Sequence, residues 1–319
     1  MWSYIIRRIL MMIPSIVLVS ILVFFTIRLI PGSIVDLMVS QNESMSETSM
    51  TRAEIEQRMG LDVPIYVQYG RWLGDIFVEG DFGHSLWKNY PILPELLHRF
   101  PVTLELVLIA VVIAMIIAFP IGIFSAIRQD TIGDYLGRSF AILAIAVPGF
   151  WIGTMVIVFP SIWWGWAPPV MFVHLTQDPI ANLKIMIIPA VIMGMSMSGI
   201  TMRMTRTMML EVLRQDYIRT AWSKGINEKT VILRHAMKNA FIPVISIIGL
   251  QIPQFIGNSL VLEQLFGLPG IGRLTIEVLI TRDYPVLSGI NILMVLVVLF
   301  TNLIVDMTYG LMDPRIRFA

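Results

Sequence analysis

Residues 102–127 read VTLELVLIAVVIAMIIAFPIGIFSAI, with Glu105 as the single charged residue. A run of this length and apolarity crosses the hydrocarbon core of a bilayer as a helix, which takes about 20 apolar residues. Five other stretches share this length and scarcity of charge, namely 9–30, 139–164, 185–202, 241–262 and 286–309. We therefore expect an all-α polytopic membrane protein with six transmembrane helices.

The composition of the whole chain agrees with this expectation. Of the 319 residues, 56% are hydrophobic and 14% are charged, whereas an average soluble domain has about 45–50% and about 25%. The mean hydropathy is +0.77, and the excess apolar surface must face lipid. The run 9–30 exceeds the apolar core of a signal peptide and lacks a small-residue cleavage site, so we expect it to be retained as the first span.

The distribution of Lys and Arg between loops gives the orientation. With the N-terminus inside, fourteen of them lie on the cytoplasmic side, whereas the short outer loops hold three. The loop 31–101 is too long for its basic residues to count. We expect a multi-pass protein of the cell membrane with both termini in the cytoplasm. The inner residues are Arg7, Arg8, Arg128, Arg138, Arg203, Arg206, Arg214, Arg219, Lys224, Lys229, Arg234, Lys238, Arg315 and Arg317.

The spans and loops divide the chain into three parts. These are the N-terminus with the first helix at 1–30, an extracytoplasmic loop with short helices at 31–101, and a five-helix core at 102–319. In the loop, Thr51 and Glu54 have the spacing of a capping box, and Gly60 can end the helix that they begin. We therefore expect a short amphipathic helix there.

The longest cytoplasmic segment, 203–240, has the pattern of a helical hairpin. Residues 208–224 are rich in helix formers. Gly225 can end the first helix in a left-handed conformation, and Asn227 can cap the second. The positive-inside rule explains the charge of this loop, but it does not require a hairpin.

One face of the first hairpin helix combines aromatic and small residues. Tyr217, Ala221 and Trp222 lie on it at helical spacing. We expect the hairpin to expose the small residue and an aromatic to the cytosol. Such a surface, rimmed by basic side chains, is typical of a docking element for a soluble partner.

Polar side chains inside the spans are candidates for the translocation path, because a polar group at membrane depth needs an interior or water-facing position. Candidates are Glu105, Gln251, Asn258 and Asn291. The amides could equally join helices by hydrogen bonds, and Glu105 near a span end could be solvated at the interface. Pro253 lies among polar neighbours, so we expect the fifth span to be a broken, pore-lining helix.

The third span contains two helix-packing signals. Gly149 and Gly153 have the G-x-x-x-G spacing that allows close approach of helices, which we expect to serve packing within the chain. Pro148 can kink the same span.

The sequence indicates no catalytic residue and no metal site. It has no cysteine, and its four histidines, His84, His98, His174 and His235, are widely spaced. No lysine follows a glycine, as the P-loop motif requires, so the chain does not bind ATP in that way. Energy for transport must come from another subunit or from an ion gradient.

Two stretches of the hairpin resemble a known family. Residues 216–225, DYIRTAWSKG, and 234–243, RHAMKNAFIP, resemble the EAA-loop signature of permeases of binding-protein-dependent ABC importers. The resemblance is greatest to the dipeptide, oligopeptide and nickel branch. Arg219 and Thr220 stand where the generic signature has Glu and Ala, and the peptide branch varies in this way. Matching motifs follow one another along the chain: IPG at 30–32, GLD at 60–62, GDFG at 80–83, TLEL at 103–106, RMTR at 203–206, LPGIGR at 268–273, RDYPV at 282–286 and DPRIR at 313–317.

The resemblance implies a type I ABC importer permease fold with a cytoplasmic coupling hairpin. It implies a second homologous permease subunit, two cytoplasmic ATP-binding subunits that carry ATP and Mg, and an extracytoplasmic solute-binding protein, with no cofactor and no nucleic acid on this chain. The solute would be a dipeptide, an oligopeptide, a nickel chelate or an oligosaccharide. The coupling residues that it points to are Asp216, Tyr217, Arg219, Ala221, Lys224, Gly225, Arg234 and His235.

Two alternatives come from other functional classes. A secondary transporter or channel would use an ion gradient, and it predicts paired ionisable residues at mid-membrane, of which the sequence has few. A membrane scaffold would leave the hairpin and the outer loop without a purpose. We therefore expect an ATP-driven permease in which the hairpin at 216–240 reorients spans four to six by alternating access.

Overall fold

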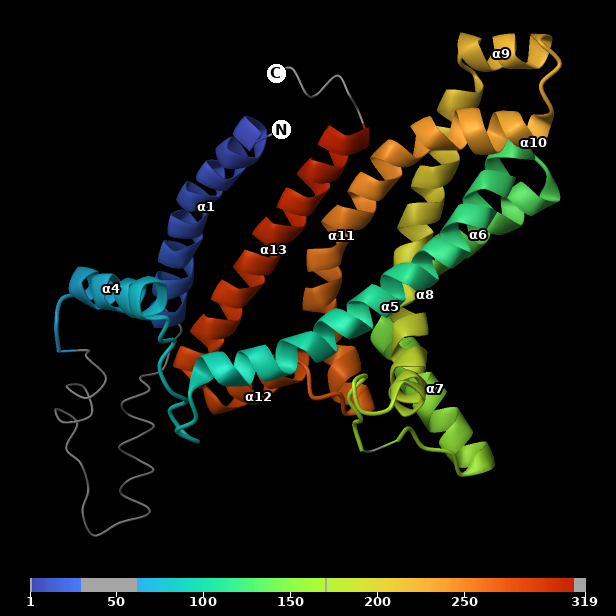
Figure 1. The fold of residues 1–319 in the computed structure, drawn as a ribbon. Helices are drawn as coiled ribbons and strands as arrows, with labels where there is room; N and C mark the ends of the chain where they lie inside the picture. The colour runs from blue at the N-terminus through green and yellow to red at the C-terminus, as the bar shows by residue number, and fades with distance from the viewer. Residues whose placement is uncertain (1, 30–61, 170, 313–319) are drawn as a thin grey trace. The chain divides into compact units, whose positions relative to one another are not determined.

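The computed structural model describes residues 2–29, 62–169 and 171–312. Within these residues almost all of the regular structure is helical, and the expected all-α class is confirmed (Figure 1). The predicted capping box of Thr51 and Glu54 and the predicted helix end at Gly60 lie outside the described residues.

Five of the described segments are long and apolar enough to cross a membrane, and the pair α6 and α7 makes a sixth if it counts as one span. This agrees with the six spans predicted. The helices are α1 (Trp2–Leu29), α4 (Ile65–Gly74), η1 (Asp75–Glu79), α5 (Ile92–Ile127), α6 (Ile132–Ala146), α7 (Gly149–Trp164), α8 (Pro179–Leu213), α9 (Asp216–Ser223), α10 (Glu228–Thr230), η2 (Val231–Ala236), α11 (Met237–Phe266), α12 (Ile271–Thr281) and α13 (Tyr284–Met312).

The third span is broken in two. The axes of α6 and α7 meet at 89°, because proline disfavours helical backbone in the residue before it and itself cannot donate a helical hydrogen bond. Val147 and Pro148 accordingly have extended backbone. The single span expected over 139–164 is therefore wrong in its shape, and its first half begins earlier, at Ile132.

The fifth span is continuous where we expected a break. Helix α11 runs unbroken from Met237 to Phe266 and contains both Pro243 and Pro253. The prediction of a broken helix at Pro253 is therefore wrong. Helix α5 also differs from expectation, because residues 92–101, which we placed in the outer loop, form its first turns.

The chain forms two compact units. The first comprises residues 1–5, 99–274 and 297–319, and the second comprises 6–98 and 275–296. In the second unit, α4 packs against α1 through aromatic side chains: the ring of Phe24 lies 5.3 Å from that of Tyr69 and 5.4 Å from that of Trp72. A hydrogen bond of 2.8 Å between the hydroxyls of Ser20 and Tyr69 fixes the same pair of helices.

The second unit also holds the loop before α5 on the turn between α12 and α13. The buried carboxylate of Asp283 accepts hydrogen bonds from the hydroxyl of Ser85 at 2.5 Å and from the backbone N–H of Leu86 at 3.2 Å. The indole of Trp87 donates to the carbonyl of Thr281 at 2.8 Å. Two segments nearly 200 residues apart in sequence are thus joined.

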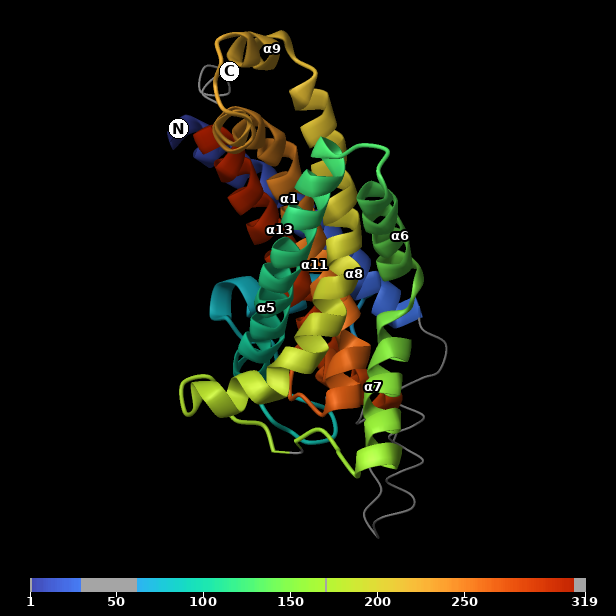
Figure 2. The same ribbon diagram turned by 90° about the vertical axis from the view of Figure 1, so that its right-hand side faces the viewer.

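In the first unit, α8 packs between α5 and α6 (Figure 2). A Cβ atom at Gly194 would lie 2.8 Å from the carbonyl oxygen of Ala110 on α5, and one at Gly199 would lie 2.7 Å from that of Ala141 on α6. Glycine at these positions lets the helix backbones touch. Gly153 likewise packs against α11 beside Leu262, so the packing expected for the third span occurs within the chain.

Candidate functional site

The segment between the fourth and fifth spans forms a hairpin at one end of α8 and α11, with α9 lying over η2 (Figure 1). Gly225 has a φ of +76°, and its N–H bonds the carbonyl of Trp222 at 2.9 Å. Asn227 accepts from the N–H of Lys229 at 3.0 Å and caps α10. The predicted left-handed turn and the predicted cap are both confirmed.

The first arm of the hairpin differs from the expected single helix over 208–224. Helix α8 continues from the fourth span to Leu213, and α9 begins at Asp216. Gln215 between them has extended backbone, with a ψ of 149°. The expected single helix is therefore wrong, and a sharp bend separates α9 from α8.

A small apolar core fastens α9 to the membrane helices. Its buried members come from α5, α8, α9, η2 and α11, and they are Ala126, Met209, Ile218, Ala221, Val231, Ala236 and Ala240. Because Ile218 and Ala221 are three residues apart, they share one face of α9 and point into this core. The expectation that Ala221 is exposed to the cytosol is therefore wrong.

Two aromatic side chains of α9 flank its buried face and are exposed. Tyr217 and Trp222 each have 43% of their surface accessible, and the surrounding polar residues include Arg219 and Asp216, whose side chains pair at 3.5 Å. The hydroxyl of Tyr217 accepts from the amide of Asn239 on α11 at 2.8 Å. The aromatic part of the predicted docking surface is thus present, and one of its members is anchored to the fifth span.

The remaining predicted coupling residues lie on the same hairpin, at the end of α9 and on η2. Lys224, Gly225 and Arg234 are exposed, and His235 is half-buried on η2. The structure therefore brings the predicted coupling residues together on one hairpin, with Ala221 beneath its surface.

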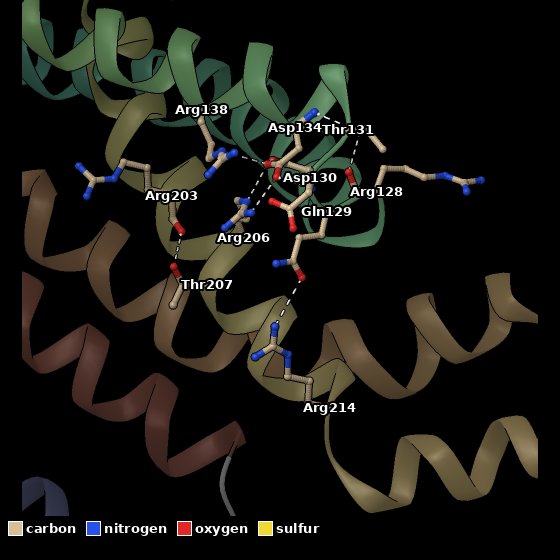
Figure 3. Close-up of polar contacts among 11 residues, drawn as sticks. Arg128, Gln129, Asp130, Thr131, Asp134, Arg138, Arg203, Arg206, Thr207 and Arg214 are labelled. Carbon is tan, nitrogen blue, oxygen red and sulfur yellow. Dashed lines mark hydrogen bonds and ion pairs between the residues drawn. The ribbon is translucent and has the colours of Figure 1, made fainter.

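A buried ion pair joins α6 to the part of α8 that leads into the hairpin (Figure 3). Asp134, in the first turn of α6, has no accessible surface. Arg206 donates to both of its carboxylate oxygens, from Nε to Oδ1 and from Nη2 to Oδ2, each at 2.8 Å. A two-point pair of this kind fixes orientation as well as distance.

Other groups complete the environment of Asp134. The hydroxyl of Ser125 donates to Oδ1, and the N–H of Asp130 donates to Oδ2 at 3.0 Å. Arg138 lies 3.5 Å from Oδ1, and its guanidinium group stacks 4.5 Å above the ring of Tyr135. The short loop between α5 and α6 is therefore closed around one carboxylate.

Sequence reasoning missed this pair. Arg206 is one of the basic residues that indicate the orientation and belongs to the RMTR motif, whereas no sequence motif singles out Asp134. A signal was present, because Thr131 followed by an acidic residue three positions later is typical of a helix N-terminus. No feature of the sequence near Asp134 indicates that its partner is Arg206 on α8.

A second buried carboxylate, Glu263 on α11, was also missed. It accepts from the hydroxyls of Thr103 at 2.7 Å and Ser259 at 2.8 Å, and from the N–H of Arg273 at 3.0 Å. The hydroxyl of Thr103 accepts in turn from the N–H of Ile271 at 2.8 Å. This network ties α5, α11 and the start of α12 together, and it accounts for the LPGIGR motif.

The candidates for the translocation path do not form one cluster. Gln251 is buried and donates to the hydroxyl of Thr201 on α8 at 3.4 Å, which supports helix packing rather than solute contact. Asn258 is exposed and lines a cavity of about 310 Å³ between α7, α8 and α11. Asn291 is half-buried in the other compact unit, and Glu105 is half-buried on α5.

Comparison with known families assigns the chain. The family described as binding-protein-dependent transport system inner membrane component matches residues 118–318, and the N-terminal domain of such components matches residues 1–107. The chain belongs to this family. The permease is therefore a membrane component of a transport system.

Known relatives match the permease over its whole length. The oligopeptide transport system permease protein AppB of Bacillus subtilis is 39% identical, with complete coverage of both chains. The dipeptide transport system permease proteins DppB of Alkalihalophilus pseudofirmus and Escherichia coli are 36% and 33% identical, with coverage of 100% and 99% of each chain.

A solved structure is similar in fold to the permease. It is the crystal structure of an amino acid ABC transporter, with a TM-score of 0.52 and 13% identity. The similarity covers 67% of the permease and 92% of that chain. At this level of identity the comparison shows a shared fold.

Proposed function

We propose that this chain is the transmembrane permease subunit of an ATP-driven ABC importer that moves peptides by alternating access. The names of the relatives, which are oligopeptide and dipeptide permeases matched end to end, support a peptide solute. The observation that carries the coupling mechanism is the apolar core that fastens α9 to the membrane helices.

The proposed partners are a second homologous permease subunit, two cytoplasmic ATP-binding subunits and an extracytoplasmic solute-binding protein. ATP and Mg would bind to the ATPase subunits. Both termini would lie in the cytoplasm together with the hairpin, in agreement with the Lys and Arg distribution. Tyr217 and Trp222 on the exposed face of α9 would contact an ATPase subunit.

A force on α9 would reach the spans through packed side chains. Ile218 and Ala221 lie in one core with Met209 of α8 and Ala240 of α11, and packed interiors resist compression. The Asp134–Arg206 pair adds α6 to the same group. Movement of the ATPase subunits would thus tilt α8 and α11, the fourth and fifth spans, together with α6.

The test is uptake of a labelled dipeptide into proteoliposomes that contain the complete transporter. We expect uptake to require ATP, the ATPase subunits and the binding protein. The ion-gradient alternative predicts uptake by the purified chain alone when a gradient is imposed. That result would overturn the proposal.

A variant pair tests the docking face. We expect Trp222→Ala to lower both ATPase co-purification and uptake at least tenfold, because aromatic anchors contribute strongly to interfaces. Trp164→Ala removes a more exposed tryptophan, with 74% of its surface accessible against 43% for Trp222, from the end of α7 and should leave both unchanged. Full ATPase binding and uptake in the Trp222 variant would refute docking through α9.

A further inference from the structure

Two buried acceptor oxygens lie without donors where α5 meets the start of α8. They are Oε1 of Glu105 and Oδ1 of Asn182, and neither has a hydrogen-bond partner among the described residues. Asn182 itself is completely buried. An unpaired buried acceptor is costly, and more so when it is charged, so two of them together require an explanation.

The donor side of Asn182 is already engaged, which fixes the orientation of its amide. Its Nδ2 donates to the backbone carbonyl of Val173 at 3.0 Å, and the side chain also lies against the carboxyl group of Glu105. His174 is close enough to interact electrostatically with Glu105, but it does not hydrogen-bond Oε1. The two oxygens left over are therefore both acceptors.

We propose that Glu105 and Asn182 form a binding site for the α-ammonium group of a peptide in transit. A primary ammonium group carries one positive charge and three N–H donors, so it can satisfy the charged oxygen of Glu105 and the amide oxygen of Asn182 together. This inference rests on the proposed function, because it takes the solute to be a peptide with a free amino terminus.

A divalent metal ion fits the same oxygens poorly. Ca²⁺ takes six to eight oxygen ligands and Mg²⁺ requires near-octahedral geometry, whereas this site offers one carboxylate and one amide oxygen. The described residues contain no group of three or more His, Cys, Asp or Glu side chains that could hold a metal. An organic cation with its own directional donors matches the site better.

The position of the pair agrees with a role early in the path. Glu105 lies within the TLEL motif, near the end of the second predicted span that is expected to face the outer side. Asn182 lies in the first turn of α8, just after the Asp178 cap. A charged group at membrane depth is expensive unless it serves a pathway or finds a partner.

The first experiment measures binding without the solute-binding protein. The transporter is purified without that protein, and its unfolding temperature is measured with dialanine or with N-acetyl-dialanine at equal concentration. A ligand that binds the folded state raises this temperature. We expect dialanine to raise it by roughly 2 °C or more, N-acetyl-dialanine to have no effect, and Glu105→Gln to abolish the rise.

A control variant and the choice of a near-isosteric test variant make the outcome of the experiment unambiguous. Glu79→Gln removes an exposed carboxylate at the end of η1 and should keep the dialanine effect. Glu105→Gln is close to isosteric, and its amide can donate to Asn182 as a protonated carboxyl group would. If Glu105 is protonated and simply bonded to Asn182, Glu105→Gln will behave as the unaltered protein. An equal effect of both peptides, or none from dialanine, also overturns the site.

Uptake of labelled dialanine by the complete transporter separates this inference from the proposed function. We expect Glu105→Gln to lower uptake at least tenfold while ATPase subunits still co-purify. Uptake by the variant equal to that of the unaltered transporter would refute the site and leave the proposed function standing. If the unaltered transporter takes up no dipeptide, the proposed function fails, and the site fails with it.

Discussion

Arg206 on α8 holds Asp134 at the start of α6 through two parallel hydrogen bonds, each 2.8 Å long. The short loop between α5 and α6 is thereby fixed to the helix that leads into the hairpin. Removing one partner of a buried pair is costly, because it leaves the other charge without compensation.

We therefore expect Arg206→Met to destabilise the chain by about 3 kcal/mol, measured as loss of resistance to detergent-induced unfolding. The double variant with Asp134→Asn should recover much of that loss, since no buried charge remains. Arg203→Met, one turn earlier and exposed, is the matched control. Equal stability of the Arg206 and Arg203 variants would show that the pair is not structurally important.

Gly225 tests the turn of the hairpin. Its φ of +76° lies in the left-handed region, and no atom lies within 4 Å of the place that a Cβ would occupy. Gly225→Ala should therefore cost about 1–2 kcal/mol through backbone strain alone, and Gly225→Asn should cost less. Under the proposed function, transport per ATP hydrolysed should fall in the order Gly, Asn, Ala. A bulky residue that supports full coupling would contradict a role for this turn.

Ala221 tests the core beneath α9. Because it is buried beside Ile218, Ala221→Leu should overpack the core and cost about 1–3 kcal/mol. Limited proteolysis of the hairpin should become faster. Thr220→Leu, at the neighbouring exposed position, should leave the cleavage rate unchanged. Similar rates for both variants would argue that α9 is not packed as described.

Gly270 tests the network around Glu263. A Cβ atom at this position would collide with the carboxylate of Glu263 and the hydroxyl of Thr103. Gly270→Ala should lower thermal stability by several degrees, whereas Gly257→Ala, which has open space on the same helix as Glu263, should not. The comparison uses the purified chain in detergent, and equal melting temperatures would contradict the packing of this turn.

Sequence reasoning succeeds where structure depends on local chemistry. The left-handed Gly225 and the capping Asn227 act within a few residues of themselves, so their conformations could be predicted. The number of spans follows from hydropathy alone, since a bilayer demands apolar length.

Prediction from sequence fails where the conformation or burial of a residue depends on its tertiary partners. Pro148 and Pro253 look alike in sequence, yet only the first breaks its helix, because packing decides whether a proline is accommodated. Asp134 and Glu263 find partners far along the chain, and a count of Lys and Arg does not include them. Helical spacing predicts which residues share a face with Ala221, but not whether that face contacts the cytosol or the core. The packing of the neighbouring helices decides between the two.

The right-angled break between α6 and α7 has a mechanical consequence. Helix α6 is bound to α8 through the Asp134–Arg206 pair, whereas α7 packs against α11 at Gly153 and against α8 at Gly149. A straight helix would force these two neighbours to move in step. With a joint at Val147 and Pro148, the two halves need not stay in line when α8 and α11 tilt, so the third span can bend at one place instead of being distorted along its length.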